Sequence, residues 1–262
     1  MPATLALPAA AFAATPIPAD SIAPVAASAP AGPRPSADPQ HETTSALTDY
    51  ASGDRRAALV QFRDAAVRGN RLAQFNYAMM LVTGEGVAAN VPEGLRWLRR
   101  AATGGMSHAQ YVLATMYDDG QYVARDPALA HGWYEKAARQ GHVQAQLALA
   151  NQFLDGRGTP RDNHRAFLWY KRAADAGEPT AQYVTASFYE RGGDGVTPDL
   201  NIARAYYAAA AAHGDEAAGL KYQEVSAALR ARVAAGASAA SGRGPAPAGA
   251  AGRSGASGTR GH

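Results

Sequence analysis

The chain has 262 residues and contains no cysteine. This absence excludes a disulfide framework, a thiolate zinc site and a cysteine nucleophile. Long apolar runs are missing as well, since none approaches the ~18 residues that a helix needs to span a bilayer. We therefore expect no integral membrane segment.

The sequence also lacks the short motifs of common catalytic sites. It has no G-x-S-x-G, no H-E-x-x-H, no G-x-x-x-x-G-K-S/T and no S-x-x-K. It has seven histidines, but none pairs with a second metal ligand at helical spacing, so we expect them to be exposed. We therefore predict a protein that is not an enzyme, with no cofactor and no metal site.

The positive charge is confined to one end of the chain. Lys and Arg number 25 and Asp and Glu number 22, a net charge of +3. Residues 231–262 contain four arginines and no acid, residues 1–40 carry a charge of −1, and residues 41–230 are therefore neutral. A neutral central region has no basic surface for a phosphate backbone, so we expect no nucleic-acid partner.

Both ends have the composition of disordered segments. Residues 1–42 hold 9 of the 16 prolines and few bulky apolar side chains, and residues 231–262 are rich in Gly, Ala, Ser and Arg. Within the leader, the short apolar stretch 5–14 contains Ala11-Phe12-Ala13, the small residues of a signal-peptidase site. This predicts export to the periplasm, but a positive n-region is missing, so a cytoplasmic location remains the alternative.

The region between the two ends is an internal repeat. The three tryptophans, Trp97, Trp133 and Trp169, are spaced 36 residues apart. Other columns keep this period, among them the glycines Gly69, Gly105, Gly141 and Gly177, the glycines Gly84, Gly120, Gly156 and Gly192, and the capping residues Asp54, Asn90, Asp126 and Asp162. The capping column continues to Asp199 after a one-residue insertion. Several columns in phase indicate a repeat protein.

Each unit has the pattern of two helices. The first helix is predicted over 71–83, 107–119, 143–155 and 179–191, because apolar residues recur there with helical spacing. A glycine loop follows, the Asp/Asn column caps the second helix, and the next periodic glycine ends it. A single helix pair cannot bury its apolar faces, so the pairs are expected to stack. The Ala-Ala columns should let the helices approach closely. Residues such as Trp133 are expected to be buried between the layers.

This pattern resembles the Sel1-like repeat, a relative of the tetratricopeptide repeat. The unit that carries the resemblance best runs from Gly105 through Ala109-Gln110, Asp126 and Trp133-Tyr134 to Gly141, whereas Tyr122 replaces the second loop glycine. The resemblance implies an all-α fold, an α-solenoid of stacked antiparallel helix pairs. We divide it into a degenerate unit 43–69, full units 70–105, 106–141, 142–177 and 178–214, and a closing helix 215–230, with Ser45 to Tyr50 as the shortened first helix.

We expect the partner to bind a groove formed by the first helices. In related arrays these helices line the concave face, and one stripe of each varies between units while the packing columns do not. The adjacent column contains methionine, a residue common at surfaces that receive apolar partners. The predicted groove consists of Leu72, Asn76, Met79, Met80, His108, Val112, Thr115, Met116, Gln144, Asn151, Gln152, Thr180, Ser187 and Phe188.

The resemblance implies an interaction scaffold rather than a reaction. We predict a monomeric bacterial adaptor that binds a peptide or protein in this groove. The alternative is a cell-envelope module that binds peptidoglycan or a β-lactam-like ligand through its tyrosines, and a hydrolase is the weakest reading. Cysteine-rich relatives linked to β-lactams staple each repeat with a disulfide, which this chain cannot form.

Overall fold

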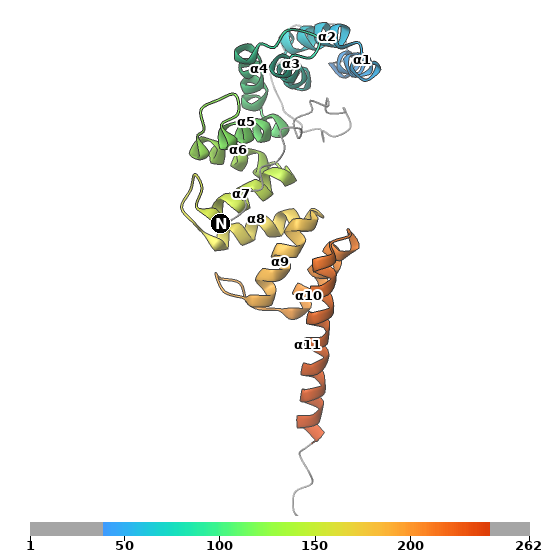
Figure 1. Ribbon diagram of the computed structural model, residues 1–262, viewed down its shortest axis with the longest axis vertical. Helices are drawn as coiled ribbons and strands as arrows, with labels where there is room; N and C mark the ends of the chain where they lie inside the picture. Colours follow the sequence, from blue (N-terminus) through green and yellow to red (C-terminus); the bar gives the residue numbers. More distant parts are fainter. Residues whose placement is uncertain (1–38, 242–262) are drawn as a thin grey trace, which may run out of the picture.

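The structure is a computed structural model that describes residues 39–241. The described residues form eleven helices and no strand, and successive helix pairs stack along the long axis of the molecule (Figure 1). The predicted all-α solenoid is thereby confirmed. In chain order the helices are α1 Pro39–Ser52, α2 Arg55–Val67, α3 Arg71–Thr83, α4 Val91–Thr103, α5 Ser107–Asp119, α6 Pro127–Arg139, α7 Val143–Asp155, α8 Asn163–Asp175, α9 Pro179–Arg191, α10 Leu200–Ala212 and α11 Glu216–Ser241.

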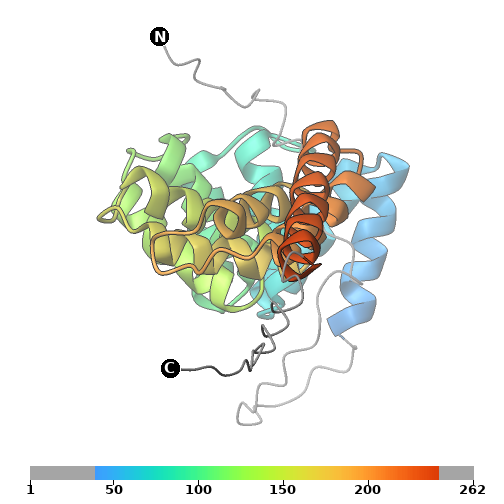
Figure 2. The same ribbon diagram turned by 90° about the horizontal axis from the view of Figure 1, so that it is seen from below.

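The array is held together by local contacts. The extensive helix–helix contacts all join helices that follow each other in the chain, as expected of a solenoid. Seen from below, the blue N-terminal helices and the green helices lie on opposite sides of the view (Figure 2), so the stack winds about its axis. Stability therefore depends on each pair and on its two neighbours.

The helix ends follow from their capping residues. The four first helices of the full units, α3, α5, α7 and α9, have the predicted bounds. The side chains of the Asp/Asn column accept hydrogen bonds from backbone N–H groups at the starts of α2, α4, α6, α8 and α10. Gly84, Gly120 and Gly156 take the left-handed conformation that ends α3, α5 and α7.

Both ends of the array differ from the prediction. Helix α1 begins at Pro39, not near Ser45, so its first turns lie within the predicted leader 1–42. Helix α11 continues to Ser241, and the predicted end at 230 is wrong because the alanine-rich stretch after it has high helix propensity and no proline before Pro245. The rest of the predicted leader, up to residue 38, and of the predicted tail, from residue 242, lies outside the described residues.

The core consists of alanine pairs and one large side chain per unit. The Ala-Ala columns, such as Ala101-Ala102 and Ala137-Ala138, are no more than 2% exposed. Small side chains here let the helices approach closely. The tyrosines of the second helices, Tyr134, Tyr170 and Tyr207, are buried against them.

The prediction that the tryptophan column is buried is wrong. Trp97, Trp133 and Trp169 are only partly buried, and each packs at the edge of the core. Adjacent residues on a helix point about 100° apart, so only one of Trp133 and Tyr134 can face the core. The outer face of each indole is covered by a cation three residues later: Lys136 Nζ lies 3.9 Å from the Trp133 ring centre, and Arg100 and Arg172 occupy the matching positions.

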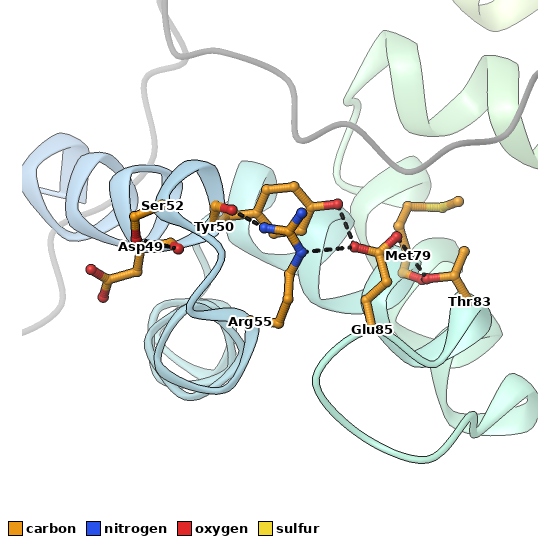
Figure 3. Close-up of polar contacts among 7 residues, drawn as sticks. All are labelled: Asp49, Tyr50, Ser52, Arg55, Met79, Thr83 and Glu85. Carbon is orange, nitrogen blue, oxygen red and sulfur yellow. Dashed lines mark hydrogen bonds and ion pairs between the residues drawn. The ribbon is translucent and has the colours of Figure 1, made fainter.

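A polar cluster joins the degenerate first unit to the first full unit (Figure 3). The Tyr50 hydroxyl at the end of α1 donates a hydrogen bond to Glu85 in the loop after α3, and Arg55 Nε lies 3.5 Å from the same carboxylate. The Arg55 guanidinium also covers the Tyr50 ring at 3.8 Å. Burial, and then the bond to Glu85, raises the pKa of Tyr50 to about 12. These contacts join the degenerate N-terminal unit to the loop of the first full repeat.

The difference between neighbouring aromatic residues can be tested on α6. Tyr134→Ala should lower the free energy of unfolding by about 3–5 kcal/mol, because it removes a large buried ring. Trp133→Ala should cost about 1–2 kcal/mol, since that ring is only partly buried at the edge of the core and a single cation–π contact is lost. Urea denaturation followed by circular dichroism measures both, and an equal loss for the two variants would contradict the assignment of Tyr134 as the core residue.

A second prediction concerns the loop glycines that touch the preceding unit. Gly158 has φ +74°, and a Cβ added there would lie 2.1 Å from the Pro127 carbonyl oxygen at the start of α6. Gly158→Ala should therefore destabilise the array by about 2–5 kcal/mol. Gly141→Ala is the matched control, because its φ is +87° but a Cβ would meet no atom within 4 Å, so only the conformational cost of about 1–2 kcal/mol remains.

Candidate partner-binding face

The first helices of successive units contact each other through aromatic side chains near their N-termini. The Phe75 ring on α3 meets the His108 ring on α5 edge-on, with 5.0 Å between the ring centres. The His108 ring in turn lies 5.4 Å from that of His142, the residue that caps α7. The first helices α3, α5 and α7 are thus neighbours, and part of each helix surface is used in this contact.

Eight of the fourteen residues predicted to line the groove are buried in the packing of the first helices against neighbouring helices. Met79 and Met116 are 6% and 1% exposed, and both belong to the core between α3 and α5. The prediction that their side chains point away from the packed face is wrong, because a first helix must contact its own second helix as well as the first helices on either side. The buried residues are Leu72, Asn76, Met79, Met80, Val112, Met116, Gln152 and Phe188.

The other six predicted residues reach solvent. Gln144, Asn151 and Thr180 are exposed, whereas His108, Thr115 and Ser187 are half-buried. All six lie on α5, α7 and α9, and none lies on α3. The structure therefore reduces the predicted groove to the surface of these three helices.

A row of apolar side chains runs between these polar residues and was not predicted. Tyr111, Leu147 and Tyr183 occupy the same position in α5, α7 and α9, and each is half-buried. Leu147 follows Gln144 by three residues and precedes Asn151 by four, so the three share one helix face. We call Tyr111, Leu147, Tyr183, Gln144, Asn151, Thr180 and Ser187 the first-helix face.

Thr115 and Asn151, on the first helices beside this row, accept hydrogen bonds from buried tyrosines of the second helices. The Tyr134 hydroxyl donates to Thr115 Oγ1 at 3.2 Å, and the Tyr170 hydroxyl donates to Asn151 Oδ1. The Asn151 amide oxygen is therefore occupied, which leaves its NH2 group to donate to a ligand. Burial raises the pKa of Tyr134 and Tyr170, the latter to about 12, so both hydroxyls keep their protons at neutral pH.

The two histidines in the stack form a neutral pair, although they were predicted to be exposed. His142 Nδ1 accepts a hydrogen bond from the Ala145 N–H, so the ring proton of neutral His142 resides on Nε2. This Nε2 lies 3.2 Å from His108 Nδ1 and can donate to it. The Tyr111 ring stacks on His142 at 4.7 Å. In the sequence, His108 and His142 are 34 residues apart, two fewer than the repeat length. His142, the capping residue of α7, therefore lies beside the first turn of α5, which contains His108.

The pair should make the protein sensitive to acid. Burial, and then the proximity of His108, lowers the pKa of His142 to about 4 in the folded state, and burial lowers that of His108. The unfolded chain takes up these protons near pH 6.5, so stability is complete above that pH and is lost as the pH falls from about 6.5 toward 4.

The variant His142→Asn tests this prediction, because asparagine can still cap α7 but does not titrate. The fall in melting temperature between pH 7 and pH 4.5 should be smaller in His142→Asn than in the parent protein. The control is His164→Asn on α8, which removes an exposed histidine that contacts the Asp194 carbonyl. If both substitutions change the pH profile equally, the buried pair is not responsible.

Adjacent carboxylates on α5 do not form a catalytic pair. Asp118 is buried and one oxygen lies 2.9 Å from Arg157 Nη1, whereas Asp119 is exposed. Burial raises the pKa of Asp118 in spite of the nearby Arg157. The two side chains diverge, as expected for neighbours on a helix, and Asp118 links α5 to the loop after α7.

Residues 39–241 contain neither a candidate metal site nor a candidate membrane-spanning helix. Within this range no group of three or more His, Asp or Glu side chains is placed to hold a metal ion. No helix in the same range is both long and apolar enough to cross a membrane.

The Sel1 repeat family model matches four consecutive segments, 71–106, 107–142, 143–178 and 179–215, which together exceed half of the chain. The chain belongs to the Sel1 repeat family. Each matched segment contains one first helix and the second helix that follows it. Proteins of this family generally act as non-catalytic scaffolds for protein interactions. No curated protein matches the chain.

The chain is also similar to solved structures of Sel1 repeat proteins. The chain is 29% identical to a Sel1 repeat protein from Oxalobacter formigenes, with a TM-score of 0.64 over 70% of this chain and 74% of that one. It is 24% identical to c5321, a protective antigen of uropathogenic Escherichia coli, with a TM-score of 0.48 over 71% of this chain and 49% of the antigen. It is 22% identical to a Klebsiella pneumoniae Sel1 repeat protein, with a TM-score of 0.44 over 72% of this chain and 93% of that one.

Proposed function

We propose that the protein is a non-catalytic adaptor that holds a segment of a partner protein against its first-helix face. Membership of the Sel1 repeat family supports a role in protein interaction. The observation that carries the proposal is the row of half-buried Tyr111, Leu147 and Tyr183, flanked by exposed amide and hydroxyl groups.

Such a face suits a peptide segment better than a compact substrate. Half-buried apolar side chains give a partner apolar surface to cover, and because packing already restricts their rotamers, binding loses little side-chain entropy. Exposed Gln144 and Asn151 carry amide groups that can pair with the backbone of an extended segment. Core alanines and buried tyrosines fix the helices beneath, so the face is formed before binding.

No observation favours the alternative of a sugar-binding or β-lactam-binding envelope module. The tyrosines of the second helices are not available to such a ligand, because Tyr134, Tyr170 and Tyr207 are buried and their hydroxyls bond to Thr115, Asn151 and Glu190. Export to the periplasm and a monomeric state are part of the proposal. A mature N-terminus near Ala14 in protein from native cells would support export, and an intact Met1 in the cytosol would contradict it.

Site-specific photo-crosslinking in native cells tests the binding face. A photoreactive residue at position 144 or 151 should give an adduct with one partner protein. The same residue at position 168 or 172 on α8 should not give that adduct, because these exposed positions belong to a second helix. Adducts from α8 alone would place the partner on the other side of the array.

The partner identified in this way allows a quantitative test. The double variant Gln144→Ala/Leu147→Ser should weaken binding by at least about tenfold, which is about 1.4 kcal/mol. The matched double variant Leu168→Ser/Arg172→Ala replaces an exposed leucine and a polar residue on α8 and should leave the affinity unchanged. Isothermal titration calorimetry measures both, and unchanged affinity in the first variant would refute the assignment.

A further inference from the structure

At the C-terminal end of the described residues, α11 occupies the position of a first helix. In each full unit the first helix packs against the second helix that follows it, as α9 does against α10. Helix α11 starts like those first helices, because the Asp215 side chain caps it by accepting from the Ala218 N–H, as Glu178 does for Ala181 on α9. Within residues 39–241 no helix follows α11, which instead continues for 26 residues, twice the length of α10 (Figure 1).

A groove lies beside α11, between it and the start of α10. It has a volume of about 910 Å³ and is lined by residues of α11 and of the start of α10. Tyr222, in register with the buried residues Tyr77 and Leu149 of internal units, is 40% exposed here. Farther along α11, Val233 lines the groove and is 73% exposed. Apolar surface that internal units cover is therefore uncovered at this end.

The groove is positively charged. Arg204 on α10 and Arg230 on α11 line it, no acidic residue lines it, and neither arginine forms an ion pair with a described residue. The nearby Glu224 is paired with Lys221 Nζ at 3.0 Å. Arginine favours carboxylates because its planar group donates two parallel hydrogen bonds. The charge of the groove thus complements an acidic ligand.

One buried polar group at the groove also lacks a partner. Ser226 lines the groove and is 9% exposed, and its hydroxyl makes no hydrogen bond to any described residue. The Ser226 Oγ atom is itself covered in the free protein, so it offers no contact to a ligand in the groove.

From these observations we propose that the α10–α11 groove binds an acidic amphipathic helix of a partner protein, which packs beside α11 as second helices pack beside the first helices of internal units. Apolar residues of the bound helix cover Tyr222, Leu229 and Val233, and its carboxylates pair with Arg204 and Arg230. Residues 242–262 of this chain do not fit, since they contain three arginines and no acid. A second copy would bring Arg230 and Arg232 of its own α11 toward a positive groove.

A synthetic helical peptide of about four turns serves as the probe, with leucine and alanine on one face and glutamate on the other. Its fluorescein-labelled form should bind the full chain in a fluorescence-polarisation titration, and binding should weaken at high salt. The same peptide with lysine in place of glutamate should not bind. Equal binding of both peptides, or no binding of the acidic one, would overturn the proposal.

Charge-matched variants locate the site. Arg204→Glu/Arg230→Glu should raise the dissociation constant of the acidic peptide by at least about tenfold. Arg96→Glu/Arg232→Glu changes the net charge by the same amount at exposed positions outside the groove lining and should have little effect. Val233→Glu should also abolish binding without lowering the melting temperature, because the side chain is exposed. Equal losses in the two double variants would mean that net charge, not the groove, attracts the peptide.

Two further measurements separate this proposal from its competitors. Gln144→Ala/Leu147→Ser should leave peptide affinity unchanged, because the first-helix face is a different surface, and a loss there would move the peptide to that face. Light scattering should show a monomer with and without Val233→Glu. A dimer that Val233→Glu converts to a monomer would assign the groove to a second copy instead.

Discussion

The structure depends on the close approach of helices at columns of alanine. Ala137-Ala138 and the matching pairs in other units are almost fully buried, and no larger residue would let consecutive helices meet at the same distance. The buried tyrosines of the second helices then fill the remaining space and bond to the first helices through their hydroxyls. Because the alanine contact recurs along the array, the stack can extend through contacts between helices that follow each other in the chain.

The same constraint determines which surface remains for binding. A first helix contacts its own second helix and the first helices of adjacent units, so most of its circumference is buried; on α3, all residues from 72 to 82 are buried. Only a narrow strip on α5, α7 and α9 stays open, and it contains apolar side chains between amide and hydroxyl groups. The protein therefore offers a linear surface across consecutive helices, which suits a segment of a partner chain.

The two ends of the array, where the outermost helix has a neighbouring unit on one side only, differ in structure. At the N-terminal end, Tyr50 and Arg55 bond to Glu85 and close the degenerate unit on the first full repeat. At the C-terminal end, α11 is longer than any other described helix and leaves a positive groove with an unpaired Ser226 hydroxyl. One end is closed by the chain itself, whereas the other offers a place for an additional helix.

The sequence by itself determined the fold class, the repeat length, the bounds of the first helices of the full units and the capping column, because these depend on local spacing and on residues with strong backbone preferences. Tertiary structure alone decided exposure. Met79 and Asn151 occupy matching positions of two units, yet Met79 is buried and Asn151 is exposed, since the difference depends on the neighbouring helices and not on the residue's own spacing. The burial of Tyr134 rather than Trp133, and the pairing of His108 with His142, likewise follow from how one unit is placed on the next, which a periodic pattern does not specify.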